Sequence, residues 1–316
     1  MSQHILSTLG RYATQLMAGT VFVALLAPDL AHLAKPLLAP SVWGLLFIAM
    51  VRLDWPGVVH HLRRYQLVSV VLIWLLVVSP ILMWGLLQFT PLSPGIIAAL
   101  VLMSASAPLM STPAVSLMIG LDGSLALVAM VTSTFIVPFT VPFLALELLG
   151  LEIEIGAIGM MLRLIAMIGS AFVVAMMVRQ FVGMAKIQDW WTGFDGILVI
   201  LMAIFALSIM DGITAVLLAE PVRVLLVVAL GFVANGGLQV FGSLVFRPLL
   251  KRERYTLGFV TGSRNMGLIL AVLPASVDSD IVLYFAMAQF PIYVLPALLR
   301  PLYGRLLDGE VKERVP

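Results

Sequence analysis

The chain has 316 residues, of which 18 are Lys or Arg and 16 are Asp or Glu. Charged residues make up 11% and hydrophobic residues 62%, whereas a soluble globular domain has about 25% and about 45–50%. This composition excludes a soluble enzyme, a disordered chain and a nucleic-acid-binding protein. The absence of Cys excludes a disulfide scaffold and thiolate chemistry. The sequence therefore indicates a polytopic helical membrane protein.

Apolar segments bounded by charged residues, Pro and Gly predict ten transmembrane helices. Residues 65–121 carry no formal charge and are long enough for two spans, since one span needs about 20 apolar residues. A transmembrane β-barrel would instead show short segments of alternating polarity. The predicted helices cover residues 12–33, 39–53, 65–89, 95–120, 122–149, 155–179, 194–212, 222–247, 254–276 and 280–302.

The positions of Lys and Arg predict the orientation, because basic residues concentrate in cytoplasmic connections. With the N-terminus inside, the outer connections carry only Lys35 and Arg223 and are otherwise acidic. We therefore predict an even number of helices, both termini in the cytoplasm, and a bacterial inner membrane as the location. The basic residues assigned to the inner side are Arg11, Arg52, Arg63, Arg64, Arg179, Lys186, Arg247, Lys251, Arg252, Arg254, Arg300, Arg305, Lys312 and Arg314.

Two arginines, Arg163 and Arg264, fall inside predicted spans. Arg163 lies near the outer end of its helix, where a long side chain can reach the interface. Arg264 is ten residues after Arg254, so it lies about 15 Å from the inner surface at 1.5 Å per residue. An arginine at this depth costs about 2.5–3.5 kcal/mol on insertion scales, which makes Arg264 a candidate functional residue.

Similar features recur five helices apart and predict an inverted repeat, with residues 1–150 as the first five-helix half and 151–316 as the second. The fifth helix carries Pro138 and Pro142, and the tenth carries Pro291 and Pro296. Since five is odd, the second half must be inserted upside down. Secondary transporters are often built in this way, with the repeats interleaved into one transmembrane unit.

The fourth and ninth helices are predicted to be broken in mid-span. Pro108 and Pro113 interrupt the fourth helix, and the polar segment Thr261-Gly262-Ser263-Arg264-Asn265 interrupts the ninth. Irregular backbone at this depth is tolerated only where it is buried in protein or lines a wet cavity. Two breaks in equivalent positions predict a binding site. The alternative is that both helices are kinked and their polar residues are satisfied structurally.

At these residues the sequence resembles the bile acid:sodium symporter family, within the bile acid, arsenite and riboflavin transporter superfamily. The resemblance covers nearly the whole chain, including the basic loop from Arg52 to Arg64, the segment from Leu121 to Leu127, and the break from Gly262 to Gly267. It implies an all-α membrane protein of ten helices in two inverted repeats. Helices 4 and 9 would cross in a core domain beside a panel of helices 1, 2, 6 and 7. Such proteins move organic anions together with sodium ions.

The sequence departs from that family at the residues that the resemblance assigns to sodium. The Ser and Asn of the family's helix 4 break fall at Pro113 and Ala114, and a shared Glu of helix 9 falls at Val260. The family's Gln before the helix 9 Asn falls at Arg264, and a helix 3 Gln falls near Leu75. The site has thus lost a carboxylate and gained a cation. Sodium remains the only cofactor that the resemblance implies, and these substitutions argue against it.

Arg264 has two candidate roles. Its five N–H donors could bond the carbonyls freed at the helix 4 break and the hydroxyls of Ser111, Thr112 and Thr132, which would hold the crossing together in place of the ion. Alternatively, its charge could face an anionic substrate. The candidate substrate- or ion-binding residues are Ser111, Thr112, Thr132, Ser133, Thr134, Thr261, Ser263, Arg264 and Asn265.

The predicted function is secondary transport of a small organic anion by alternating access, with the lipid bilayer and that anion as partners. The alternatives are a transport-inactive receptor on the same fold and a conventional sodium symporter with rearranged ligands. A channel is a further alternative, which conductance far above carrier rates would reveal. A membrane enzyme would need a nucleophile and a base, and no His or carboxylate accompanies the hydroxyls of the site. Asn235 and Gln239, one helical turn apart, are predicted to join helices rather than bind a ligand. The sequence does not predict the oligomeric state.

Overall fold

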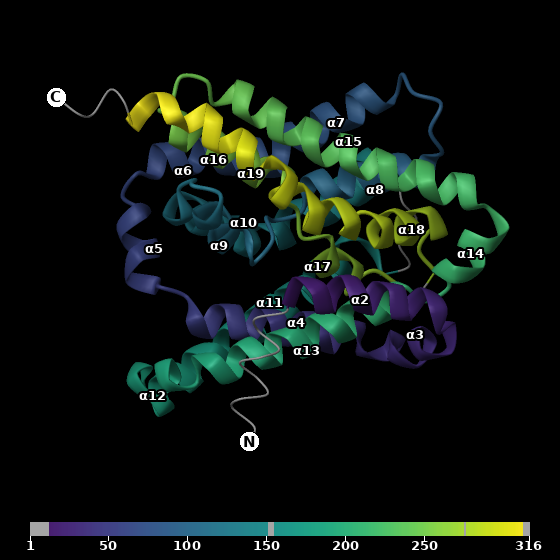
Figure 1. Ribbon diagram of the computed structural model, residues 1–316, viewed down its shortest axis with the longest axis horizontal. Coiled ribbons are helices and arrows are strands. Elements are labelled where there is room, and N and C mark those ends of the chain that lie inside the picture. Colours follow the sequence, from purple (N-terminus) through teal and green to yellow (C-terminus); the bar gives the residue numbers. More distant parts are fainter. Residues whose placement is uncertain (1–12, 151–154, 275, 312–316) are drawn as a thin grey trace. The chain divides into compact units, whose positions relative to one another are not determined.

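A computed structural model describes residues 13–150, 155–274 and 276–311 (Figure 1). The protein is 83% helical, and its described part contains no β-strand. The single β-bridge, an antiparallel one, pairs Pro108 with Arg264. Three of the basic residues assigned to the inner side, Arg11, Lys312 and Arg314, lie outside the described residues.

The helices follow one another in chain order. The first half contains α2 (Ala13–Leu26), α3 (Pro28–Ala34), η1 (Lys35–Leu37), α4 (Leu38–Arg52), α5 (Trp55–His61), α6 (Tyr65–Ile73), η2 (Trp74–Val78), α7 (Ser79–Leu87), α8 (Pro94–Ala105), α9 (Thr112–Met118), α10 (Gly123–Phe143) and η3 (Leu144–Leu148). The second half contains α11 (Gly156–Val182), α12 (Met184–Asp189), α13 (Trp191–Ile209), α14 (Ile213–Ala219), α15 (Pro221–Val245), α16 (Lys251–Gly262), α17 (Met266–Leu270), α18 (Ser279–Met287) and α19 (Gln289–Val311).

Six continuous helical stretches of the described chain are long and apolar enough to cross a membrane, and a seventh forms if α13 and α14, bent by 47°, count as one span. These long apolar helices indicate a membrane-embedded protein. The six stretches are Pro28–Arg52, Tyr65–Leu87, Gly123–Leu148, Gly156–Val182, Pro221–Val245 and Ser279–Leu307.

The remaining predicted spans are interrupted or short. The segment predicted at 12–33 is not one helix, because α2 ends at Leu26 and Pro28 starts α3. Proline suits the first turn of a helix and cannot continue the preceding one. The segments predicted at 95–120 and 254–276 are each divided by a non-helical stretch, 106–111 and 263–265. The two interruptions lie where Pro108 and the polar segment around Arg264 predicted breaks.

Contacts divide the chain into two compact units, of which the first comprises Met1–Leu53 and Leu162–Val224. In this unit α13 packs along α4, α2 and α3 (Figure 1). Arg52 at the end of α4 forms an ion pair of 2.6 Å with Asp195, and Arg179 donates to the carbonyls of Val51 and Leu53. These contacts join the end of α4 to α11 and α13, and the indole N–H of Trp43 in α4 donates to the hydroxyl of Ser170 in α11 at 3.0 Å.

The second unit comprises Asp54–Met161 and Leu225–Pro316. In it α8 packs against α7 and α18, and α10 packs against α9 and α16. Helices α15 and α16 approach closely at Gly258, where a methyl group would lie 2.7 Å from the backbone oxygen of Gln239. Gln239 accepts a hydrogen bond from Tyr303 of α19 and donates one to Asn235. This confirms that Asn235 and Gln239 face one another, and Gln239 joins two helices as predicted.

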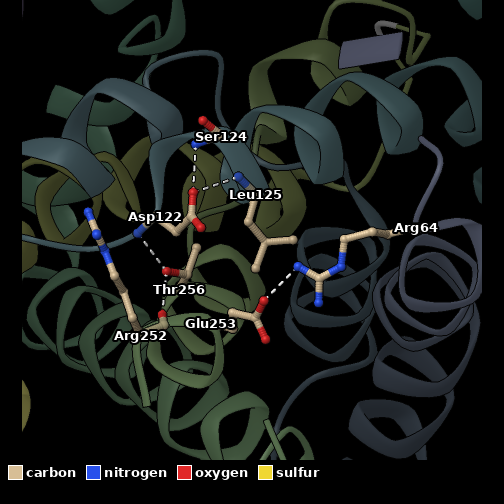
Figure 2. Close-up of polar contacts among 7 residues, drawn as sticks. All are labelled: Arg64, Asp122, Ser124, Leu125, Arg252, Glu253 and Thr256. Atoms are coloured by element: carbon tan, nitrogen blue, oxygen red, sulfur yellow. Dashed lines mark hydrogen bonds and ion pairs between the residues drawn. The ribbon is translucent and has the colours of Figure 1, made fainter. Parts of the chain in front are cut away.

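A group of polar residues joins the ends of α6, α10 and α16 (Figure 2). Arg64 points toward Glu253, and its Nη1 lies 2.6 Å from the Glu253 Oε1 in an ion pair. The hydrogen bond to this carboxylate raises the pKa of Arg64. Asp122 caps α10 by accepting from the backbone N–H groups of Ser124 and Leu125. The hydroxyl of Thr256 accepts from the Asp122 backbone N–H at 2.8 Å. These contacts fix one end of the second unit.

Candidate functional site

The candidate site lies in the second unit, where the two interrupted helices meet. Helix α8 ends at Ala105, and the chain stays non-helical until α9 begins at Thr112. Helix α16 ends at Gly262, and α17 begins at Met266 after Asn265, whose side-chain oxygen accepts from the Leu268 N–H. Each interruption leaves backbone groups without their usual helical partners.

The two non-helical segments satisfy part of each other's backbone. The N–H of Asn265 donates to the carbonyl of Ala107 at 2.7 Å, and the N–H of Leu109 donates to the carbonyl of Ser263 at 3.1 Å. Pro108 and Arg264 lie opposite each other between these two bonds. The breaks therefore form one joined structure within the apolar interior, as irregular backbone at membrane depth requires.

Arg264 occupies the centre of this structure and is fully buried, with 0% of its surface exposed. Its Nε donates to the carbonyl of Thr261 at 2.6 Å. Its Nη1 donates to the carbonyl of Ser106 at 2.7 Å and to that of Leu75 at 3.3 Å. Its Nη2 donates to the hydroxyl of Ser79 at 3.3 Å. The guanidinium thus binds oxygens from three separate segments of the second unit.

The Leu75 carbonyl is free because the helix is disturbed there. In a regular α-helix it would accept from the N–H of Ser79, four residues later. The π-helical turn η2 diverts that N–H to the carbonyl of Trp74, and the following residue, Pro80, has no N–H. Leu75 therefore presents an unpaired carbonyl in the interior, and Arg264 satisfies it.

The other two carbonyls are free because of the breaks themselves. The carbonyl of Ser106 follows the end of α8. The carbonyl of Thr261 would accept from the N–H of Asn265, but this group donates to Ala107 instead. All three carbonyls that bind Arg264 have thus lost their helical partners, and one side chain satisfies them together.

The charge of Arg264 is not neutralised by a carboxylate within the described part of the chain, since all four of its acceptors are uncharged oxygens. A positive charge bound only by carbonyl dipoles and a hydroxyl has the chemistry of a coordinated metal cation rather than that of an ion pair. Burying such a charge costs several kcal/mol, which the oriented dipoles must offset.

The predicted hydroxyl partners of Arg264 are not the ones observed. Thr132 donates to the carbonyl of Val128 at 2.6 Å, and the hydroxyl of Thr112 is buried without a hydrogen-bond partner among the described residues. Ser111 is exposed and does not contact Arg264. That part of the prediction is wrong, and the hydroxyl that accepts from the guanidinium is that of Ser79 in the third predicted helix. The expected bond to a carbonyl freed at the helix 4 break is present at Ser106.

The remaining predicted site residues divide into two groups. Thr261 and Ser263 flank Arg264, and each contributes its backbone carbonyl to the joined breaks. The hydroxyls of Ser133 and Thr134 donate to carbonyls of their own helix, at 2.6 and 2.7 Å, and do not reach Arg264. The structure thus brings the helix 9 residues together with the helix 4 break and leaves the α10 hydroxyls apart.

The contribution of the third predicted helix was not expected from the sequence. Besides Leu75 and Ser79, this helix provides Trp74, whose indole N–H donates to the hydroxyl of Thr261 at 3.0 Å. The available signal was the Ser79-Pro80 pair inside an otherwise apolar span, since a mid-span proline frees a carbonyl one turn earlier. The sequence matches no protein-family model and none of the curated proteins.

Proposed function

We propose that this protein is a secondary transporter of a small organic anion in which Arg264 takes the place of a coupling cation. The observation that carries the proposal is the binding of one buried guanidinium by three carbonyls and a hydroxyl from three segments. Unwound backbone carbonyls of this kind coordinate sodium in ion-coupled transporters. A cation that is part of the chain would fill that position permanently and make sodium unnecessary.

The division of the chain into two units supports the same proposal. The first unit contains the predicted helices 1, 2 and 7 and most of helix 6, and the second contains the others. This is the division into panel and core that the resemblance to bile acid:sodium symporters implies. Interleaved inverted repeats of residues 1–150 and 151–316 would each contribute to both units. Alternating access needs two bodies that each keep their own internal packing.

The experiment that tests the proposal is uptake into liposomes that contain the purified protein. The panel of radiolabelled anions includes benzoate, pyruvate, cholate, taurocholate and benzenesulfonate. We expect saturable uptake of at least one member by the wild-type protein and none by Arg264→Gln, while the variant still inserts into the membrane. Arg305→Gln, which changes a basic residue of the last helix far along the chain from the site, serves as the matched control.

The alternatives give different results in the same experiment. A transport-inactive receptor would bind an anion, detected as a rise in its melting temperature, without moving it into liposomes. A sodium symporter with rearranged ligands would show uptake only with a sodium gradient. Wild-type uptake by Arg264→Gln would contradict both roles considered for this arginine.

We also propose that both termini lie in the cytoplasm and that the membrane is a bacterial inner membrane. The support is the distribution of Lys and Arg, which places Arg63, Arg64, Arg252 and Arg254 on one side. Because the chain contains no Cys, a single cysteine at Ser2 can be labelled without background. In intact cells a membrane-impermeant maleimide should not label Ser2→Cys, and labelling would contradict the orientation.

A further inference from the structure

The fixed position of Arg264 determines which charges can move during a transport cycle. Four hydrogen bonds hold its guanidinium to Thr261, Ser106, Leu75 and Ser79, and its backbone lies opposite Pro108. The cation is therefore attached to the chain at several points within one unit. Unlike a bound sodium ion, it cannot be taken up on one side and released on the other.

A proton is the other cation that commonly accompanies an anion, and it needs a titratable carrier near the site. From Tyr65 to Leu121 the sequence contains no charged residue and no His, and from Tyr255 to Val277 the only charged residue is Arg264. The segments that form the site therefore contain no acidic or imidazole group that could carry a proton.

The acidic residues described elsewhere in the second unit lie at or near helix ends. Asp122 and Asp278 cap helices, Glu253 pairs with Arg64, and Ser93 donates to Asp280. Glu147 lies in the last turn of η3, at the end of the span Gly123–Leu148. None of these carboxylates is among the four groups that accept hydrogen bonds from Arg264.

We infer that the protein moves its anion without a compensating cation, so that each cycle transfers the anion's own charge across the membrane. This inference rests on the proposed function and adds its energy source and direction. The membrane potential, negative inside, then drives the anion outward. The net activity in a cell is export of a small organic anion, in contrast to sodium-driven uptake.

The test uses the full chain in sodium-free liposomes with a potassium gradient and valinomycin. Taurocholate and benzenesulfonate are the probes, because a sulfonate stays ionised and does not cross the bilayer as a neutral acid. With tenfold more potassium outside, the interior becomes positive, and a monovalent anion that moves alone should accumulate about tenfold at steady state. Reversing the potassium gradient should reverse the ratio, and a pH gradient without a potential should give no accumulation.

The controls separate the inference from the proposed function. Glu147→Gln should reach the same accumulation ratio as the wild-type protein, because this carboxylate carries no proton in the cycle. The inference would be overturned if the inside-to-outside ratio of the anion were the same with and without the potassium gradient, or if accumulation followed the pH gradient. Either result would leave the transporter proposal intact. Movement of neither sulfonate under any gradient, by a protein that also takes up no other anion of the panel, would contradict the proposed function and the inference together.

Discussion

Replacement of Arg264 by Ala removes the side chain that joins three segments of the second unit. A hydrogen bond from a charged donor contributes about 1.5–3 kcal/mol, so the loss of four bonds corresponds to about 6–12 kcal/mol. In the wild-type protein, burying a positive charge that has no carboxylate partner costs several kcal/mol, and the variant no longer bears this cost. We therefore expect a net destabilisation of about 2–5 kcal/mol and a melting temperature lowered by about 5–15 °C in detergent.

Rescue by a small cation makes this prediction specific. The cavity left by Arg264→Ala is surrounded by the oxygens of Leu75, Ser106, Thr261 and Ser79, and a free guanidinium ion can donate to the same oxygens. Guanidinium at about ten millimolar should raise the melting temperature of the variant and leave the wild-type protein unchanged. Potassium chloride at equal ionic strength is the control. A variant as stable as the wild-type protein, with no response to guanidinium, would refute the assigned role.

Three further substitutions test how the site and its surroundings are built. Pro80→Ala restores an N–H that can pair within its own helix, so Arg264 should lose an acceptor and anion uptake should fall several-fold while the protein stays inserted. Gly258→Ala forces a methyl group between two helices and should lower the free energy of unfolding by about 1–3 kcal/mol. Gly237 has open space around it, so Gly237→Ala should leave that free energy unchanged. Thr256→Val leaves the Asp122 N–H unpaired and should lower the free energy of unfolding by about 1–3 kcal/mol. Thr256→Ser keeps the hydroxyl and should retain wild-type stability.

The location of the site was predictable because the signals are local. Pro108 and the polar segment that contains Arg264 stand out in apolar spans, and both interruptions appear where these residues predicted them. Long apolar spans such as Tyr65–Leu87 and Gly156–Val182 were also placed within a few residues, because length and composition decide them.

The partners of Arg264 were less predictable, because they depend on tertiary packing and on backbone atoms. Hydroxyls such as that of Thr132 were the expected partners, yet this hydroxyl donates to a carbonyl of its own helix. The carbonyl of Leu75 is an acceptor only because η2 and Pro80 together remove its helical partners. Pro80 signals that a carbonyl is freed in this helix, but a pattern of side chains does not reveal the π-helical turn that makes Leu75 the acceptor.

The central claim is that Arg264 makes sodium unnecessary, and the most direct measurement is the sodium dependence of uptake for one transported anion. Initial rates are compared in liposomes with sodium on both sides, with a sodium gradient, and with sodium fully replaced by choline. Equal rates in the three conditions are the predicted result. A rate that rises with the sodium gradient and falls to background in choline would contradict the account.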